Sequence, residues 1–498
     1  MEYSKRVRTG FAQQEEEKEK VIFNSYINQR TTFAHSVCED SVSFFIKKCE
    51  NICKIQILFV SLHRKKNRQY ESNDSHTIHK QISEMGFSLE LLSILYWFAE
   101  CYSRCLDITL ESQFVIISSS QMRGIKSIYF DNIGIERYLT QERCDRIIFY
   151  DKPTKFVGEL GYEEKGTGKH QSNVIYSQDY PARTLCAVDW KAPLLALFPP
   201  KEGAGEVLFR GDRYSIRRLT DREYWQLQSC DLADYDKING SVSKTWIYTL
   251  IGNSIAVNVL RDTFIKYLNS FVGTDKKLRL FESFSGMGTQ AMALKKANIQ
   301  YENVCTSEIE PNAIIAYAMI HCGMKKNDER INEVNLDEAK EFLLSHNICY
   351  NFKTEQVELP KSSKKIKEIY LACQLSKNMG DITGIDTNKV PDMDLFTFSS
   401  PCTDISRAGN QQGFAEGSGT RSSLLWECEK ILRDKRPKYI MMENVKDIAS
   451  PKFRDGFGKW LDILKNYGYE CHWSIENAVN HNVPQFRERM ILFGICRL

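Results

Sequence analysis

The sequence predicts an α/β fold, with a doubly wound sheet in its second half and a mixed α+β region before it. Two observations support this prediction. From residue 278 onward, apolar strand-like runs alternate with helical patterns, as in sheets whose strands are joined by helices. Polar or glycine-rich loops follow these runs, and ligands of such sheets bind beside the carboxyl ends of the strands. The loops after the strand-like runs are therefore where a functional site is expected.

The first half gives a weaker pattern. Residues 1–150 mix helical patterns with strand-like runs, and residues 150–215 are rich in glycine and proline, which indicates loops on a small sheet or an inter-domain surface. Cys49 with Cys53, and Cys101 with Cys105, are spaced four apart. Because structural zinc sites use shorter spacings, we interpret these cysteines as buried thiols and predict no metal site.

The second half contains the alternation itself. The strand-like runs are LRLFESF, YENVCTSEI, MDLFTFSS and KYIMMENV, and the helical patterns that follow them are TQAMALKKA, PNAIIAYAMI, SSLLWECEKILRD and a stretch at about 454–466. Residues 325–375 are charged and irregular, and we predict that they form a surface excursion from the core.

Composition limits the class of protein. The chain has 498 residues, of which 42% are hydrophobic, and a net charge of +3, enough for two or three domains and compatible with nucleic-acid binding without requiring it. No apolar run reaches the roughly 18–20 residues that a membrane span needs, and the charged start is no signal peptide. We therefore expect a cytoplasmic protein whose 16 cysteines are mostly reduced.

A nucleotide-like ligand is predicted at the first loop of the alternating region. Gly286 and Gly288 follow a strand-like run and open a helical pattern, where glycine permits a tight turn and close backbone approach. Glu308 lies 20 residues further on, where an acid can hold ribose hydroxyls. Asp381 could accept a hydrogen bond from an adenine amino group, or it could be a turn or helix-cap residue.

Cys402 is the candidate nucleophile. It stands directly after Pro401, at the end of a strand-like run and in the same row as the glycine-rich loop. The proline fixes the turn and keeps Ser400 extended. The stretch that follows is long, polar and glycine-rich, which suits a lid that closes over a substrate.

Two further loops belong to the same predicted crevice. MMENVKD places Glu443 and Asn444 after the next strand-like run, and VPQFRERMILFGI places Gln485, Arg487 and Arg489 before the last one. A thiol, a carboxyl group and two guanidinium groups would then converge. Each has a structural alternative, a helix cap for Glu443 and surface charge for the arginines, but together they indicate a nucleophile with polar readers of a heterocycle.

The motifs FSGMG, SPC, ENV and QFRER, in that order, resemble the DNA cytosine-5 methyltransferase family over about residues 278–496. The resemblance implies a Rossmann-like sheet that binds S-adenosylmethionine. It also implies methyl transfer to carbon 5 of a cytosine flipped out of double-stranded DNA, with target recognition by sequence.

The resemblance assigns roles to individual residues. Cys402 would add to carbon 6, Glu443 would hold N3 and the exocyclic amine, and Arg489 would hold O2. Arg487 would fix Cys402 and the lid at 403–423. The residues implied to line the cofactor pocket are Phe284, Gly286, Gly288, Glu308 and Asp381, with Ile309 at a position where many family members carry a larger, stacking residue.

The order of motifs indicates a circular permutation. The runs that usually follow QxRxR lie upstream here: YPARTLCAVDWKAP, IRRLTDREYWQLQ and WIYTLIGNSIAVNVL, at 180–193, 216–228 and 246–260. The last would place Asn253 and Ser254, after Gly252, at the opening of a helix near the methionine end of the cofactor. Joining the old ends at 269–277 costs little where they lie close together.

The permutation predicts three regions. These are a target-recognition region at 1–180, in which about half of residues 1–150 could instead be an accessory domain, the permuted motifs at 181–270 and the catalytic domain at 271–498. Recognition is assigned to the first region by elimination, with 150–180 and 120–127 as the preferred DNA-facing pieces.

Two alternatives stay open: an enzyme of the same family that modifies RNA, and a DNA-binding relative that has lost activity. The intact cysteine, glutamate and arginines argue against the second. Amine methyltransferases of DNA use an Asn/Asp-Pro-Pro-Tyr type motif, and none is present. The expected partner is double-stranded DNA, with a monomer as the functional form. The expected setting is a restriction–modification system with a separate cognate endonuclease, or a phage or prophage.

Overall fold

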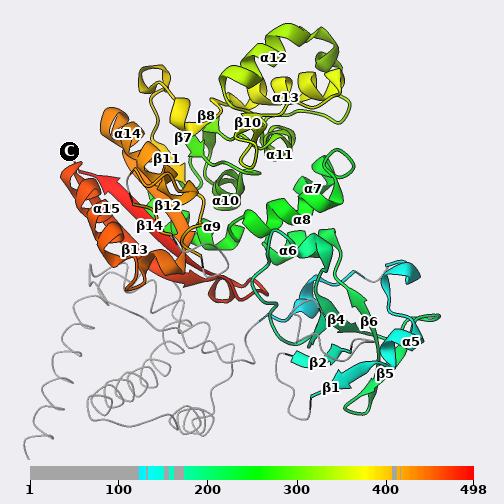
Figure 1. Ribbon diagram of the computed structural model, residues 1–498. Coiled ribbons are helices and arrows are strands. Elements are labelled where there is room, and N and C mark those ends of the chain that lie inside the picture. Colours follow the sequence, from blue (N-terminus) through cyan, green and yellow to red (C-terminus); the bar gives the residue numbers. More distant parts are fainter. Residues whose placement is uncertain are drawn as a thin grey trace, which may run out of the picture. The chain divides into compact units, whose positions relative to one another are not determined.

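The computed structural model describes residues 123–130, 133–150, 156–161, 173–406, 412–415 and 417–497 (Figure 1). The chain divides into two compact units, Met1–Phe114 and Val115–Leu498. The first unit, including Cys49, Cys53, Cys101 and Cys105, lies outside the described residues. So do most of the DNA-facing candidate at 150–180 and part of the lid predicted at 403–423.

A six-stranded mixed sheet forms the centre of the second unit. Its strands, in spatial order, are β13 (Tyr469–Asn477), β14 (Glu488–Cys496), β12 (Tyr439–Val445), β11 (Leu395–Phe398), β7 (Leu278–Ser283) and β8 (Tyr301–Ser307). The last four are parallel, and β14 runs antiparallel to both β12 and β13. The chain leaves β7 toward β8 and returns to its other side as β11. This reversal makes a doubly wound α/β sheet, which confirms the predicted class.

Alternation of side chains divides the core into two layers. Phe396 and Phe398 pack with Trp426 and Trp460 on one face, whereas Leu395 belongs to the cluster on the other face. Strands buried on both faces are typical of parallel sheets covered by helices. The covering helices are α9 (Val257–Tyr267), α10 (Thr289–Lys296), α11 (Pro311–His321), α13 (Ser363–Ser376), α14 (Leu425–Lys435) and α15 (Arg454–Asn466).

The predicted excursion is an ordered substructure. It contains α12 (Leu336–Ser345), a hairpin of β9 (Tyr350–Asn351) and β10 (Gln356–Val357), and then α13. Figure 1 shows α12 and α13 side by side, beyond the β8 edge of the sheet. The excursion is therefore folded structure added next to β8, the strand that ends at the predicted cofactor loop.

A second sheet occupies the region in which a small sheet is expected. Its spatial order is β1 (Ile147–Phe149), β2 (Phe156–Leu160), β3 (Val174–Tyr176), β4 (Leu195–Phe198), β6 (Asp212–Arg218) and β5 (Glu206–Phe209). β3 pairs with β4 in parallel, Ile175 opposite Leu195. The predicted boundary at residue 180 thus falls between two paired strands of one sheet.

A buried ion pair joins this small sheet to the helices that follow. Arg217 on β6 donates two hydrogen bonds, of 2.7 and 2.8 Å, to the Glu223 carboxylate, and both side chains are fully buried. The Arg217 guanidinium also lies 3.6 Å from the Phe198 ring centroid. Thr220 and Glu223 cap the start of α6 (Asp221–Leu227) reciprocally. Breaking the pair would strand a charge in the core.

The helices after α6 correct one sequence-based expectation. Gly252 and Asn253 end α8 (Lys244–Asn253) and Ser254 is its C-cap, whereas the next helix, α9, begins at Val257. The GNSI run therefore closes one helix before another opens. A glycine is needed there because a Cβ at Gly252 would lie 2.2 Å from the Ala187 nitrogen.

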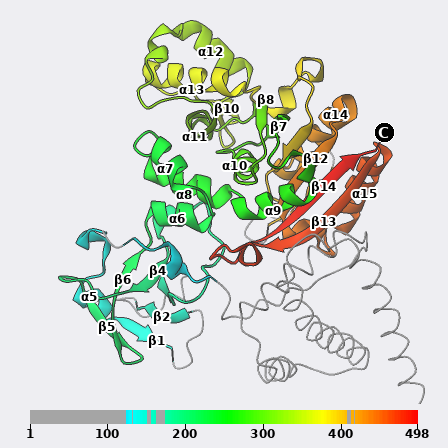
Figure 2. The ribbon, with the colours of Figure 1, turned by 180° about the vertical axis from the view of Figure 1, so that it is seen from behind.

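Among the described residues, no helix combines the length and the apolar composition that crossing a bilayer would take. α9 packs against α10 (Figures 1 and 2), so the end of the predicted region 181–270 adjoins the first helix of the central sheet.

Gly252→Ala tests the close approach of α8 to the Cys186–Ala187 backbone. Because backbone atoms cannot yield as a flexible side chain can, we expect overpacking to lower the free energy of unfolding by about 1–3 kcal/mol. Thermal unfolding followed by circular dichroism measures this.

Gly458→Ala is the matched control within α15. Its Cβ would meet no atom within 4 Å, so the change should stabilise the helix by about 0.5–1 kcal/mol. Equal melting temperatures for the two variants would contradict the packing described for Gly252.

Candidate functional site

Strands β7 and β11 end on one line, and that line passes through Met442 of β12. Ser283, Phe398 and Met442 are in register across β7, β11 and β12. One residue beyond that line lie Phe284, Ser399 and Glu443, so the loops singled out in the sequence share one edge of the sheet. Register alone thus brings the glycine-rich loop, the cysteine loop and the glutamate together.

The glycine-rich loop turns through left-handed conformations. Phe284, Gly286 and Gly288 have φ values of +53°, +55° and +79°. A Cβ at Gly288 would lie 2.4 Å from His321 Nε2, whereas a Cβ at Gly286 would meet nothing within 4 Å. Gly288 is thus required for packing against the protein, and Gly286 faces open space that a ligand could use.

Glu308 closes this loop from the neighbouring strand. Its carboxylate accepts hydrogen bonds from the backbone nitrogens of Gly286 (2.9 Å), Ile309 (2.9 Å) and Glu310 (3.0 Å). Burial raises the pKa of Glu308, and these backbone donors oppose the shift. Two carboxylate oxygens offer about four acceptor positions, so the group can still accept a hydrogen bond from a ligand hydroxyl.

Asp381 lies at the same edge as a cap. Its carboxylate accepts from the Thr383 nitrogen at 3.1 Å and from Asn347 Nδ2 at 3.2 Å, and it is the N-cap of a short 3-10 helix. Asn378, which the sequence analysis did not single out, accepts from the Glu308 and Gly380 nitrogens. It bridges the acid and the Asp381 turn, and no spacing in the sequence signals that role.

Cys402 is half-buried at the end of the β11 loop. Its carbonyl accepts from the nitrogens of Ile405 (3.1 Å) and Ser406 (2.9 Å), which fixes the turn after it. Burial and the nearby Glu443 raise the pKa of the thiol, and the positive charges of Arg489 and Arg487 oppose the shift. In this state the thiol form is favoured over the thiolate.

Glu443 and Arg489 form the polar pair beside this thiol. Arg489 Nε lies 3.0 Å from Glu443 Oε1, and both side chains are largely buried. Burial raises the pKa of Glu443, and the two arginines together with hydrogen bonds from Arg489 and Ser399 oppose it. Ser399 also accepts from Gln290 on α10 at 3.3 Å, so the pair is linked to the helix of the glycine-rich loop.

Arg487 contacts the segment at 181–270. Its guanidinium donates to the carbonyls of Leu185 (3.0 Å), Gly252 (2.9 Å) and Ser254 (2.5 Å). Burial lowers its pKa to about 9. These contacts differ from the expected role, in which Arg487 fixes Cys402 and the lid, and that role stays a prediction. Asn253 and Ser254 therefore lie where residues 182–185, 227–228 and 252–254 contact the QFRER stretch at 485–489, an arrangement that we call the junction.

Gln485 strengthens the same junction. Its side chain accepts from the Leu185 nitrogen at 3.0 Å and donates to the Leu227 carbonyl at 2.7 Å. Ala182 pairs with it in parallel, as the Ala182 nitrogen donates to Pro484 and the Phe486 nitrogen donates to Ala182. A buried polar side chain thus joins positions about 300 residues apart.

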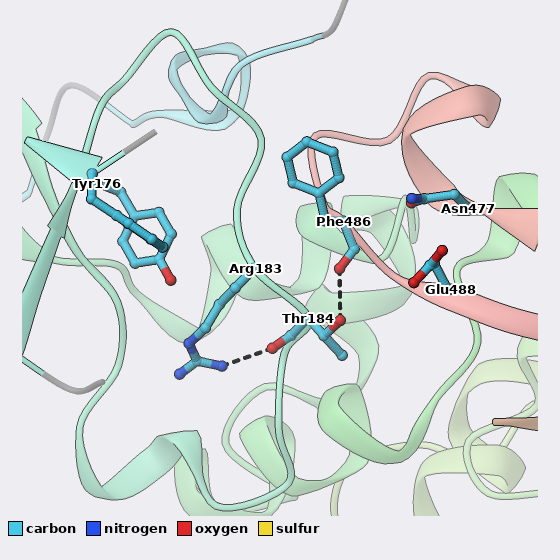
Figure 3. A pocket seen from close by; sticks show the side chains of 7 residues that line it. Tyr176, Arg183, Thr184, Asn477, Phe486 and Glu488 are labelled. Carbon is cyan, nitrogen blue, oxygen red and sulfur yellow. Dashed lines mark hydrogen bonds between the residues drawn. The ribbon is translucent and has the colours of Figure 1, made fainter. Parts of the chain in front are cut away.

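A pocket of about 400 Å³ opens beside this junction (Figure 3). It is lined by Phe156, Tyr176, Arg183, Thr184, Asn477, Phe486 and Glu488. Thr184 Oγ1 donates to the Phe486 carbonyl, and Arg183 Nη1 donates to the Thr184 carbonyl. The lining comes from the small sheet and the central sheet together, so no single sequence motif indicates the pocket.

His481 lies between α9 and β13 as a charged link. Its two ring nitrogens contact Asp262 at 2.7 Å and Glu476 at 3.1 Å. Burial alone would lower the pKa of His481, but hydrogen bonds to these two carboxylates outweigh it and raise the pKa to about 9. The link therefore joins α9, in the segment at 181–270, to the central sheet.

Comparison with known proteins gives one family and a consistent set of relatives. Residues 350–497 match the model of the C-5 cytosine-specific DNA methylase family. The chain is 45% identical over 219 residues to the type II methyltransferase M2.ScrFI of Lactococcus lactis subsp. cremoris, covering 44% of this chain and 61% of that protein. It is 34% identical over 230 residues to the orphan methyltransferase M.SssI of Spiroplasma monobiae, covering 44% and 59%.

Among solved structures, the S. pombe Dnmt2 methyltransferase is 21% identical and covers 45% of this chain and 50% of that one, with a TM-score of 0.26. The chain spans about three fifths of the length of the curated relatives described above.

His481 makes stability depend on pH. Because its folded pKa is above the ordinary value of 6.5, its contribution is complete below about pH 6.5 and is lost as the pH rises through about 9. The shift corresponds to on the order of 3 kcal/mol. Melting temperatures measured from pH 6 to 9.5 should fall more steeply for the wild type than for His481→Gln.

The control variant is His472→Gln, on the exposed face of β13. His472 is half exposed beside Glu470, and this variant should keep the wild-type profile. Parallel curves for wild type and His481→Gln would show that the Asp262–His481–Glu476 link contributes nothing.

Proposed function

We propose that the chain is an active DNA cytosine-5 methyltransferase, a proposal that the match of residues 350–497 to the C-5 cytosine-specific DNA methylase family and the similarity to the relatives above support. The observation that supports this best is the convergence of Cys402, Glu443 and Arg489 at one edge of the sheet, with Glu443 and Arg489 3.0 Å apart. Its substrate would be a cytosine in double-stranded DNA. S-adenosylmethionine would be the methyl donor.

The residues at the glycine-rich edge suit that donor. Gly286 faces open space where another residue would carry a Cβ, and Glu308 keeps acceptor capacity for ribose hydroxyls. Phe284, Gly288, Ile309 and Asp381 would complete the adenosine end, with Asn253 and Ser254 toward the methionine end. When bound, S-adenosylmethionine supplies an electrophilic methyl group on a sulfonium.

Carbon 5 of cytosine needs activation before it can accept this methyl group. The Cys402 thiolate would add to carbon 6, forming a covalent S–C bond and giving the ring enamine character at carbon 5. After transfer, carbon 5 loses its proton and the S–C bond breaks, which regenerates the Cys402 thiolate. The thiol form favoured in the free protein would therefore lose its proton when the substrate is in place.

Glu443 and Arg489 would balance charge during the addition. Burial raises the pKa of Glu443, so its carboxyl group can supply the proton that N3 takes up as Cys402 adds. The resulting carboxylate stays paired with Arg489, whose other nitrogens can hold O2. Cytosine cannot be reached within a duplex, so the base would be flipped out at a cost of a few kcal/mol.

We propose that the chain is circularly permuted. Gln485 and Arg487 bind residues 185, 227, 252 and 254, so the runs found upstream pack against the QxRxR stretch that they would ordinarily follow. α9 packs on α10, which suits a short join at 269–277. Target recognition would then belong to residues 1–180, ahead of the junction.

The setting follows from the same proposal. One of the relatives above is named a type II methyltransferase and the other an orphan methyltransferase, and in either setting one recognition region reading one site suits a monomer. A cognate restriction endonuclease would act as a separate protein. Action on DNA in a bacterial or phage-infected cell implies a cytoplasmic location.

Cys402→Ser tests the function directly. We expect genomic bisulfite sequencing of a host without its own cytosine methylation to show protected cytosines in one fixed sequence context for the wild type. We expect none for the variant, because a serine hydroxyl is a far weaker nucleophile than a thiolate.

Cys471→Ser, a cysteine on β13 away from the Glu443–Arg489 pair, should methylate like the wild type. If soluble wild-type protein leaves the genome unprotected, the DNA-modifying function is wrong, and labelled S-adenosylmethionine with RNA substrates becomes the next assay.

The permutation is tested by restoring the usual order. A chain of residues 275–498 joined through a glycine-serine linker to residues 1–274 opens an exposed turn before β7. We expect it to methylate the same sites with a melting temperature within a few degrees of the wild type, because every junction contact is kept.

A second rearranged chain, opened between Leu260 and Arg261 inside α9, should lose methylation activity and should melt well below the wild type. The first rearranged chain, which begins at residue 275, can also refute the proposed order. It would do so if it were soluble but hydrogen exchange showed that residues 182–185 no longer pack against Gln485.

A further inference from the structure

The excursion at 336–376 returns to the predicted cofactor edge at two points. The Cys349 nitrogen donates to the Ile309 carbonyl at 3.0 Å, and the Asp381 nitrogen donates to the His346 carbonyl at 3.0 Å. Asn347 Nδ2 adds the bond to the Asp381 carboxylate. The turn 346–349 is therefore hydrogen-bonded to Ile309 and to Asp381, two of the residues predicted to line the cofactor pocket.

Backbone strain shows that this turn is held in place. Cys349 has a φ value of +71°, in the left-handed region that a residue such as cysteine rarely adopts, whereas Asn347, at +52°, is the left-handed residue that ends α12. Such conformations persist where the surroundings fix them, and they cluster at ligand clamps. Here Cys349 is fixed on both sides, because its carbonyl also accepts from the Glu358 nitrogen.

The hairpin that leaves this turn presents an exposed aromatic ring. Phe352 is 44% exposed, and Tyr350 lies against it edge-on with the ring centroids 5.1 Å apart. The Arg421 guanidinium lies 4.1 Å from the Phe352 ring centroid. A phenyl ring covered by a guanidinium on one face and a ring at its edge still offers a face to a flat ligand.

Arg421 in turn belongs to the Cys402 loop. The Ser422 nitrogen donates to Asp404 and the Asp404 nitrogen bonds to Ser422 Oγ, both at 3.1 Å. Partial burial lowers the pKa of Arg421, and the charges of Asp404 and Cys402 oppose the shift. The hairpin thus connects the adenosine edge with the segment that carries the nucleophile.

We propose that Phe352 is a cofactor-positioning residue, whose ring, held by Arg421, stacks on the adenosine end of S-adenosylmethionine. The inference rests on the proposed function and adds to it a contact from outside the family's motifs. A purine is the flat, polarisable group that such a ring takes. The 346–349 turn bonds to Asp381 and to Ile309, the residue after Glu308, so the hairpin starts next to the residues where the ribose and adenine would lie.

The test is the affinity of the full-length protein for S-adenosylhomocysteine, measured by calorimetry without DNA. Phe352→Ala and Phe352→Leu should both weaken binding by about two- to tenfold, the range expected for one aromatic stacking contact. Phe352→Trp should bind within about twofold of the wild type, because a larger aromatic ring keeps the contact.

Leu344→Ala is the matched control, since Leu344 is a 50% exposed apolar residue on α12 of the same excursion. It should bind like the wild type. Unchanged affinity in Phe352→Ala, or equal weakening in Leu344→Ala, would overturn the inference while leaving the proposed function intact. Failure of the wild type to bind S-adenosylhomocysteine would instead refute the proposed function.

Discussion

The structure depends on one buried cation. Arg487 places its guanidinium among the carbonyls of Leu185, Gly252 and Ser254, in a position where water cannot replace it. Each buried carbonyl that lost its donor would cost about 1–3 kcal/mol. Because these carbonyls come from a crossover segment and a helix end, the guanidinium holds the small sheet, α8 and β14 in one arrangement. Arg489 lies two residues further along the chain, on β14, and pairs there with Glu443 of the neighbouring strand β12.

The charges around Cys402 keep its thiol protonated, and therefore weakly nucleophilic, in the free protein. Glu443 and the apolar surroundings favour the protonated form of Cys402, whereas Arg489 and Arg487 favour the thiolate. A substrate that takes the Glu443 proton and binds Arg489 would alter this balance. The nucleophile would then be formed only when a base occupies the crevice. The 3.0 Å contact between Glu443 and Arg489 thus influences the protonation of Cys402 and also fixes the positions of the two side chains.

Much of the central sheet could be predicted from the sequence, because buried parallel strands and their loops leave local patterns. The helix expected at about 454–466 is α15, Arg454–Asn466, and the residues quoted from four motifs lie at one edge. Contacts between distant segments left no such pattern. The ending of α8 at Asn253 depends on how closely Ala187 approaches Gly252, and the pairing of β3 with β4 across residue 180 depends on tertiary packing. The partners of Arg487 are backbone carbonyls, which no side-chain motif can reveal.

The shared core has a consequence for synthesis. Helices α6 to α9 bury their apolar faces in the same cluster as residues of β7, β11 and β14. These helices leave the ribosome before any of those strands exist. At roughly 5–20 residues per second, the remaining 228 residues after residue 270 (498 minus 270) take on the order of ten seconds or more. During that interval the apolar surface of the helices has no partner, so the nascent chain depends on being kept from aggregation until its second half arrives.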